Sequence, residues 1–286
     1  IGNMSLLNLQ KKKLKYKIKI KKINNNFQVK DLLTSQMPVY NVDYEQKKPF
    51  EKITSKSNKY IFQCFDVALS LSKNKKIIGF INCPVAKETL FKNKHQGITE
   101  YLSKKENKKN NGVMLIYNKS LSVSPLTTHI SINEVKNKIK YNEIVKRTKT
   151  INYFYKKNFN KKPIIAILGL NPHNYYSKKE VKVKNIINKA VKKLNILNIK
   201  IEGPISPDSS FINYKKNKLD VIIGMYHDQV LTPFKTIFKF DAINITLGLK
   251  YLRVSPDHGP AFDIAEKNCA NSESLCAALE FLNKNV

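Results

Sequence analysis

The sequence LDVIIGMYHDQ at residues 219–229 joins a short apolar run to a polar turn that contains His227 and Asp228. Branched aliphatic residues in so short a run are typical of a buried strand. The chain repeats this order of strand, polar loop and helix, with further predicted strands at residues 77–81, 113–117, 121–128 and 163–168. Because strands that alternate with helices form a mostly parallel sheet covered on both faces, the sequence predicts an α/β fold.

Capping signals and apolar spacing predict helices between these strands. Ser131 with Glu134, and Ser177 with Glu180, each form the S-x-x-E pattern of a capping box, which starts a helix. Apolar residues recur at helical spacing in three stretches, residues 61–69, 183–194 and 272–282.

The chain before residue 76 is less regular. Apolar residues and lysines alternate from residue 14 to residue 20, a pattern that predicts a half-buried strand. Residues 24–57 are polar and irregular, and we expect them to form a long surface excursion. The repeated strand, loop and helix pattern begins only at residue 76.

The 286 residues include 52 Lys+Arg and 21 Asp+Glu, a formal net charge of +31. Such an excess ordinarily indicates a nucleic-acid partner. Here it is almost all lysine, spread along the chain with abundant Asn and Ile, which an A/T-rich coding sequence explains. The aromatic residues fall mostly inside apolar segments rather than between basic ones, so we expect no specific nucleic-acid binding. A positive field would still attract a phosphorylated substrate.

The cysteines and the hydropathy of the chain bear on its compartment. The four cysteines form no CxxC pair, which is typical of a protein in a reducing compartment. No uninterrupted apolar stretch is long enough to span a bilayer, so we expect no membrane partner.

Three of the five histidines follow predicted strands. His129, His173 and His227 each lie just past the end of one. Ligands of parallel sheets bind beyond the carboxyl ends of the strands, and three imidazoles suit Zn²⁺ or another divalent ion. Each histidine alone could be an ordinary loop residue, but together they favour a metal site. Asp228 either orients the imidazole of His227 or caps a helix.

A further histidine, His258, lies in the loop SPDHGPA at residues 255–261. It either stabilises a turn or contacts a cofactor. Lys87, which follows Cys83 and Pro84, is another polar candidate near the site.

At these motifs the sequence resembles the 4-hydroxythreonine-4-phosphate dehydrogenase family. YHDQ at residues 226–229, NITLGL at 244–249 and DHG at 257–259 occur in the family's order, which is more specific than any one motif. GLNPH at residues 169–173 and TTH at 127–129 extend the match upstream. The resemblance is clear from about residue 77 to the end and weak before it.

The resemblance implies a set of site residues. The family's metal-binding histidines fall on His129, His173 and His227, for a divalent ion such as Zn, Mg or Co. Its substrate-contacting residues fall on Thr99, Lys235, Asn244 and Arg253. Lys235 and Asp228 are the predicted catalytic residues.

The segment at residues 258–271 is also similar to the adenine-side loop of isocitrate and isopropylmalate dehydrogenases. That similarity implies that His258, Gly259, Ala261 and Asn271 hold NAD without a GxGxxG fingerprint, and none is present. NADP stays open as the alternative cofactor.

The resemblance also implies a fold and an assembly. We expect an α/β/α isocitrate/isopropylmalate dehydrogenase-like fold with the active site in the interdomain cleft. Residues 1–286 would form one catalytic unit of two closely packed subdomains, approximately 1–105 plus 245–286, and 106–244. A homodimer with metal ligands shared between subunits is expected.

The implied reaction is the NAD-dependent, metal-assisted oxidation of 4-phosphooxy-L-threonine. Decarboxylation then gives 3-amino-2-oxopropyl phosphate, in pyridoxine and pyridoxal 5′-phosphate biosynthesis. Lys235 and Arg253 would supply cations for the phosphate and carboxylate. A cytoplasmic location is expected with this function.

The sequence departs from the family pattern in ways that keep alternatives open. The family's opening strand and Gly-Asp-Pro-x-Gly-Ile-Gly loop are not found, and the chain is expected to start after them. The family's Gly-His-Thr-Glu is Gly97-Ile98-Thr99-Glu100 here. Two alternatives therefore remain: a dehydrogenase of threonate or erythronate phosphate, and a non-catalytic paralogue.

Overall fold

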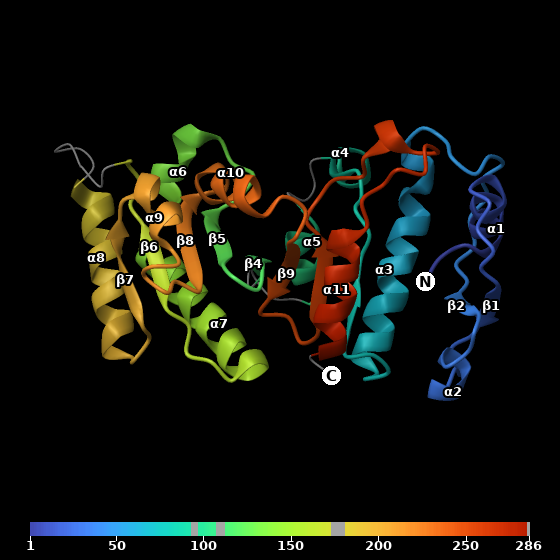
Figure 1. Cartoon of the computed structure of the whole chain (residues 1–286), viewed down its shortest axis with the longest axis horizontal. Helices are drawn as coiled ribbons and strands as arrows, with labels where there is room; N and C mark the ends of the chain where they lie inside the picture. Colours follow the sequence, from blue (N-terminus) through green and yellow to red (C-terminus); the bar gives the residue numbers. More distant parts are fainter. Residues whose placement is uncertain (93–96, 107–111, 173–180, 285–286) are drawn as a thin grey trace. The chain divides into compact units, whose positions relative to one another are not determined.

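The computed structural model describes residues 1–92, 97–106, 112–172 and 181–284 (Figure 1). Backbone contacts divide the chain into two compact units, and each is described by itself. The first unit comprises residues 1–80, 84–95 and 258–271, and the second comprises 81–83, 96–257 and 272–286. Within the described residues, no helix has both the length and the apolar character needed to cross a membrane.

The first unit contains mostly short elements. Their bounds are α1 (Met4–Lys13), β1 (Ile20–Ile23), α2 (Val29–Leu32), β2 (Met37–Tyr40), η1 (Ser55–Ser57), α3 (Asn58–Lys73), α4 (Lys87–Phe91) and η2 (Phe262–Ile264). Strand β3 (Gly79–Ile81) crosses from the first unit into the second. Strands β1 and β2 pair in parallel. Helix α3 confirms the helix predicted from residues 61–69, with Phe65, Ala68 and Leu71 buried.

The strand predicted at residues 14–20 is wrong except at its end. Helix α1 stops at Lys13, Lys15 adopts a left-handed conformation with φ of 58°, and the strand begins only at Ile20. Tyr16 and Ile18 remain 50% and 42% exposed. Because these two side chains do not pack against an apolar surface, the alternating pattern does not form a half-buried strand here. The predicted irregular excursion at residues 24–57 also contains α2 and β2.

The second unit is built on a sheet whose strands run mostly in one direction. These strands are β4 (Val113–Tyr117), β5 (Ser122–Thr127), β6 (Ile165–Leu168), β7 (Ile201–Ile205), β8 (Val221–Tyr226), β9 (Ile243–Leu247) and β10 (Leu252–Pro256). They are adjacent in the order β10-β9-β4-β5-β8-β6-β7. Strands β5, β8, β6 and β7 are parallel neighbours, whereas β4 is antiparallel to β5 and β9, and β10 to β9.

This topology confirms the predicted α/β fold with a mostly parallel sheet. Because β4 reverses direction between β5 and β9, strand β9 runs the same way as β5. The last residues of β5, β6, β8 and β9 therefore lie at one edge of the sheet, here named the carboxyl edge. The first residues of β4 and β10 lie at the same edge.

Helices cover both faces of this sheet. They are α5 (Ile98–Lys105), α6 (Ile132–Lys138), α7 (Tyr141–Phe159), α8 (Val181–Ile196), α9 (Pro207–Asn213), α10 (His227–Phe238) and α11 (Glu273–Lys284). Successive side chains of β8 enter different cores, as the pleat of a strand requires. Val221 and Ile223 pack with residues of α7 and α8, whereas Ile222 packs with residues of α9 and α10.

The capping box of Ser131 and Glu134 starts α6 as predicted. The second predicted box, Ser177 with Glu180, lies outside the described residues. Helix α8 confirms the apolar spacing at residues 183–194.

The second unit also includes segments that the predicted division assigns elsewhere. Residues 96–105, 245–257 and 272–286 belong to it by their contacts. The reason is that β9 and β10 are hydrogen-bonded into its sheet beside β4. The division into catalytic subdomains itself stays a prediction.

Candidate active site

His129 and His227 meet at the carboxyl edge. They follow β5 and β8, which are parallel neighbours with Thr127 paired to Tyr226. Their ring centroids are 6.0 Å apart, with 36° between the ring planes. The sheet topology thus brings together two of the three histidines that the sequence singled out, although they are nearly a hundred residues apart in the chain.

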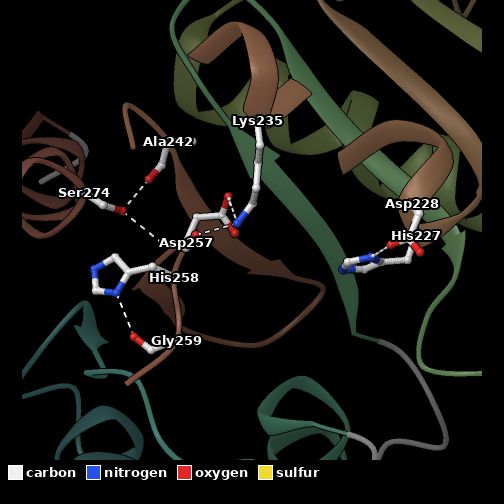
Figure 2. Close-up of polar contacts among 8 residues, drawn as sticks. All are labelled: His227, Asp228, Lys235, Ala242, Asp257, His258, Gly259 and Ser274. Carbon is white, nitrogen blue, oxygen red and sulfur yellow. Dashed lines mark hydrogen bonds and ion pairs between the residues drawn. The ribbon is translucent and has the colours of Figure 1, made fainter. Parts of the chain in front are cut away.

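His227 is oriented by its sequence neighbour. It is the first residue of α10, and its Nδ1 lies 2.6 Å from Oδ1 of Asp228 (Figure 2). A carboxylate in the first turn of a helix is also favoured by the helix dipole. Because Nδ1 is engaged by Asp228, Nε2 is the nitrogen left to bind a ligand. Asp228 therefore fits the first interpretation, orienting the imidazole, and it does not cap the helix, because it lies inside the first turn of α10 and the N-cap residue is Tyr226.

Gly97 allows the start of α5 to approach His129 closely. A Cβ at this position would lie 3.7 Å from Nε2 of His129 and 2.9 Å from Oε2 of Glu100. The backbone of Gly97 is extended, so a larger residue here is limited by space and not by conformation. Sequence reasoning noticed Gly97 and Glu100 only as parts of a motif and missed their place beside a histidine.

The third predicted metal ligand, His173, lies outside the described residues. Within the residues that are described, no three His, Cys, Asp or Glu side chains are grouped closely enough to hold a metal ion. The pair that is described has suitable chemistry, because imidazoles from adjacent strands, one of them held by a carboxylate, are typical ligands of divalent ions. The described histidines therefore fit a divalent metal ion.

Gln229 ties the strands of the histidine loops together. Its Oε1 accepts a hydrogen bond from the backbone nitrogen of Met225 at 2.7 Å, and its Nε2 donates to the carbonyl oxygen of Gly169 at 2.8 Å. Gly169 directly follows β6, so one amide links the ends of β6 and β8. Sequence reasoning gave Gln229 no role, although its place in the YHDQ motif was a usable signal.

Arg253 and Thr99 are linked through Thr246. Arg253 is 2% exposed, and its Nη1 donates to Oγ1 of Thr246 at 3.0 Å while its Nε donates to Oδ1 of Asn82 at 2.7 Å. The hydroxyls of Thr99 and Thr246 are 3.0 Å apart. Burial lowers the pKa of Arg253 to about 10, against the opposing charges of Glu100 and Tyr251, so the guanidinium is still charged at neutral pH.

Asn244 lies on the same face of β9 as Thr246, two residues further from the carboxyl edge. Its Oδ1 is buried and, within the described part of the chain, accepts no hydrogen bond. The structure therefore links Thr99 and Arg253 through Thr246, and it places Asn244 two residues from Thr246 on the same face of β9. Sequence reasoning missed Thr246, although period-two alternation from Asn244 could have identified it.

Lys235 is held at the end of β10. This residue of α10 donates from Nζ to the carbonyl oxygen of Asp257 at 2.8 Å and pairs with Oδ2 of the same residue at 3.4 Å (Figure 2). The Lys235 side chain is 42% exposed and that of Asp257 only 12%. A buried carboxylate thus anchors a half-exposed ammonium group.

Ser274 fixes Asp257 in turn. Its Oγ accepts from the backbone nitrogen of Asp257 at 3.0 Å and donates to the carbonyl oxygen of Ala242 (Figure 2). Ser274 is 1% exposed. One buried hydroxyl therefore joins the start of β9, the end of β10 and the first turn of α11. Sequence reasoning assigned no role to Asp257 or Ser274.

The predicted cofactor residues lie in the first unit, within 258–271. Nδ1 of His258 is 2.9 Å from the carbonyl oxygen of Gly259 (Figure 2). Within the described residues, a Cβ on Gly259 would meet no atom within 4 Å beyond its chain neighbours, and Ala261 is in the left-handed region with φ of 49°. Asn271 is exposed, and Lys87 starts α4 in the same unit. The loop therefore has an open backbone that a ligand can approach.

The chain has an α/β fold with two histidines at the carboxyl edge of its sheet, and its matches to known proteins place it among oxidoreductases. The family model described as pyridoxal phosphate biosynthetic protein PdxA matches residues 1–282, and the chain belongs to this family. This membership confirms the predicted family and enzyme class.

Two relatives and one solved structure illustrate the match. The chain is 34% identical to a 4-hydroxythreonine-4-phosphate dehydrogenase of Sulfurihydrogenibium sp., over 98% of this chain and 86% of that protein. It is 29% identical to a D-threonate 4-phosphate dehydrogenase of Pectobacterium atrosepticum, over 77% of this chain and 68% of that protein. The crystal structure of 4-hydroxythreonine-4-phosphate dehydrogenase from Klebsiella pneumoniae superposes with a TM-score of 0.81 and 25% identity, covering 98% of this chain and 86% of that one.

Proposed function

We propose that this protein oxidises 4-phosphooxy-L-threonine with NAD and a divalent metal ion. Decarboxylation of the product then gives 3-amino-2-oxopropyl phosphate for pyridoxal 5′-phosphate biosynthesis. The observation that carries the proposal is the meeting of His129 and His227 at the carboxyl edge, with Asp228 holding one ring, in a member of this family. A divalent ion, when bound, supplies positive charge that lowers the pKa of the substrate hydroxyl and stabilises the enolate.

The proposed metal ligands are His129, His173 and His227. The described pair supports this, and so does the amide of Gln229, which ties the end of β6 to that of β8. Zn and Co suit imidazole ligands, whereas Mg prefers oxygen ligands and would need them from water or the substrate.

The proposed substrate contacts use hydrogen-bond donors and acceptors that neighbouring residues do not already engage. Nε and Nη1 of Arg253 are engaged by Asn82 and Thr246, so Nη2 is the nitrogen best placed to donate to a substrate anion. Lys235 has three donors, and its bonds to Asp257 leave capacity for a phosphate or carboxylate. Thr99 and Asn244 would add hydrogen bonds, and the buried Oδ1 of Asn244 is suited to accept one.

The proposed reaction has two steps, an oxidation and a decarboxylation. The hydride on the hydroxyl-bearing carbon passes to NAD, and the hydroxyl proton leaves to a base. The resulting β-keto acid loses CO₂, and the carbon that carried the carboxylate takes up a proton. Lys235 is the proposed acid–base group, with Asp228 acting through the imidazole of His227.

NAD is proposed to contact His258, Gly259, Ala261 and Asn271. The open space at Gly259 and the left-handed backbone of Ala261 support close approach by a nucleotide. NADP is the alternative. A homodimer with a shared active site and a cytoplasmic location are proposed along with this function.

The test measures metal content and NADH formation together. Wild type and His227→Ala would be assayed with 4-phosphooxy-L-threonine, NAD and added divalent ion. Thr236→Ala is the matched control, because its exposed hydroxyl donates to the carbonyl oxygen of Thr232 in the same helix. We expect wild type and Thr236→Ala to bind metal and form NADH, and His227→Ala to lose both. Absence of both from wild type would reject the proposal in favour of a non-catalytic paralogue.

A phosphorylated sugar acid is the second candidate substrate. Ile98 replaces the family's histidine and is only 6% exposed, and one relative is named for D-threonate 4-phosphate. 4-Phosphooxy-L-threonine carries an ammonium group where the phosphorylated sugar acid carries a hydroxyl. Comparing kcat/KM for both with the same enzyme preparation decides between them.

A further inference from the structure

Arg147 is a partly buried cation with no place in the proposed chemistry. It lies on α7, and Arg147 and Arg253 are the two arginines among 52 Lys+Arg residues. Arg253 already belongs to the site. Since basic residues in this chain are otherwise lysine, the second guanidinium calls for a reason particular to its surroundings.

The guanidinium of Arg147 bonds where β4 and β5 separate. The two strands pair only at Ile116 with Val123 and at Tyr117 with Ser122. Beyond these two pairs, side-chain hydrogen bonds take the place of backbone hydrogen bonds between β4 and β5. Nη1 of Arg147 donates to Oγ of Ser124 at 3.2 Å, and that hydroxyl donates to the carbonyl oxygen of Met114 at 2.6 Å.

Nη2 of Arg147 donates to the carbonyl oxygen of Leu126 at 3.1 Å. Leu126 lies three residues before His129, and between them Thr127 donates from Oγ1 to the carbonyl oxygen of Met225 at 2.7 Å. The end of β5 is therefore held on one side by β8 and on the other by Arg147. His129 itself has a φ of 53°, which is uncommon for a residue other than glycine and needs support from its surroundings.

A lysine could not make this pair of contacts in the same way. The planar fork of a guanidinium donates in two fixed directions, here to Ser124 and to Leu126, whereas an ammonium group is a compact point charge. Burial lowers the pKa of Arg147 to about 10, while Glu143 and Glu100 oppose the shift, so the group is charged at neutral pH. The chain thus keeps a partly buried charge that bonds to the backbone three residues before His129.

We propose that Arg147 is a positioning residue that fixes the end of β5 and thereby aims the imidazole of His129 for metal binding. This inference rests on the proposed metal role of His129. Arg147 touches neither substrate nor metal, and its effect passes through the backbone of residues 126–129.

The test titrates Co²⁺ into the full-length metal-free protein and follows the visible absorption of the bound ion. The variants are Arg147→Lys and Arg147→Met, with Lys149→Met as the control for loss of an exposed cation on α7. His129→Ala sets the level for loss of the ligand. Far-ultraviolet circular dichroism and thermal unfolding of the metal-free proteins report folding separately.

We expect Co²⁺ affinity to fall about tenfold to a hundredfold in both Arg147 variants, as for other residues that orient metal ligands, with a changed absorption spectrum. Arg147→Lys should stay folded and still show the loss. Lys149→Met should match wild type.

Two further outcomes separate this inference from the function on which it rests. If His129→Ala loses Co²⁺ but Arg147→Lys binds it as wild type does, or fails to fold, Arg147 serves the fold alone and the inference is overturned. If wild type binds no Co²⁺, or His129→Ala binds it normally, the proposed metal role fails first and the inference fails with it.

Discussion

Nζ of Lys235 is 2.8 Å from the carbonyl oxygen of Asp257 and 3.4 Å from its Oδ2, so one residue holds the lysine through both its backbone and its side chain. The two residues lie on different elements, α10 and the turn after β10. The Lys235 side chain is 42% exposed and would otherwise be flexible. Its contacts with Asp257 therefore fix the position of the ammonium group that is proposed to act on the substrate.

Asp257→Asn should lower kcat/KM about tenfold to a hundredfold. The backbone contact remains, but the ion pair is lost and Lys235 becomes free to move away from the reacting groups, and small misplacements are costly in catalysis. Steady-state NADH formation measures the effect. Glu280→Gln is the control, because it removes a carboxylate from an exposed ion pair with Lys119. Unchanged kinetics in Asp257→Asn would show that the carboxylate has no positioning role.

Ser274→Ala should lower the free energy of unfolding by about 1–3 kcal/mol, the usual cost of leaving buried polar groups unsatisfied. The hydroxyl is 1% exposed, and its loss leaves the nitrogen of Asp257 and the carbonyl of Ala242 without this partner. Urea unfolding measures the change. Ser70→Ala, at an exposed serine inside α3, should change stability by less than about 0.5 kcal/mol. Equal effects of the two variants would contradict the argument.

Much of the second unit could be predicted because its segments carry two kinds of local signal. Apolar runs such as residues 219–223 identify strands, and the Ser131–Glu134 capping box identifies the start of α6. The antiparallel insertion of β4 could not be predicted, since strand direction depends on the connections between strands. The alternation at residues 14–20 failed because such a pattern predicts a strand only where an apolar surface exists for it to cover.

The candidate site also contains some residues that could be predicted from the sequence and others that could not. His129 and His227 could be found because each ends a strand, and the parallel topology then brings them together. Residues that act on other site residues gave no such signal. Ser274 and Thr246 are ordinary by type, and their roles come from contacts with Asp257 and Arg253 that only the folded chain creates.

Arg253→Met should reduce kcat/KM about a hundredfold to a thousandfold, as when one donor to a reacting anion is lost. Burial lowers the pKa of Arg253 to about 10, so the wild-type side chain stays charged at pH 7–9. The ratio of wild-type to variant kcat/KM should therefore stay constant over this range and narrow only near pH 10, where the arginine loses its proton. Lys250→Met, at an exposed cation nearby, is the control. A ratio that changes between pH 7 and 8 would assign the effect to another group.

Adding a divalent ion should stabilise the folded protein. A ligand at one hundred times its dissociation constant adds about 2.7 kcal/mol if it binds only the folded state. The thermal midpoint should rise with Zn²⁺ or Co²⁺ and return to its starting value with a chelator. His227→Ala should show almost no rise. A rise of the same size in that variant would place the ion at another site.

Gly97→Ala should leave the fold intact but weaken metal binding. The glycine has an extended backbone that any residue adopts, so alanine adds no conformational strain. Its Cβ would lie 2.9 Å from Oε2 of Glu100, a flexible atom that can move, and 3.7 Å from Nε2 of His129. We therefore expect a change of less than about 1 kcal/mol in the free energy of unfolding, together with lower Co²⁺ affinity, because Glu100 must move beside the imidazole.

Gly203→Ala is the matched contrast for this prediction. Gly203 has a φ of 140°, and a Cβ there would lie 2.4 Å from the backbone oxygen of Ile167, which cannot move independently of β6. That variant should lose stability by several times as much as Gly97→Ala, as measured by urea unfolding. If Gly97→Ala instead unfolds as easily as Gly203→Ala, the space at Gly97 serves the fold, whereas unchanged Co²⁺ affinity would show that the approach of α5 to His129 does not shape the site.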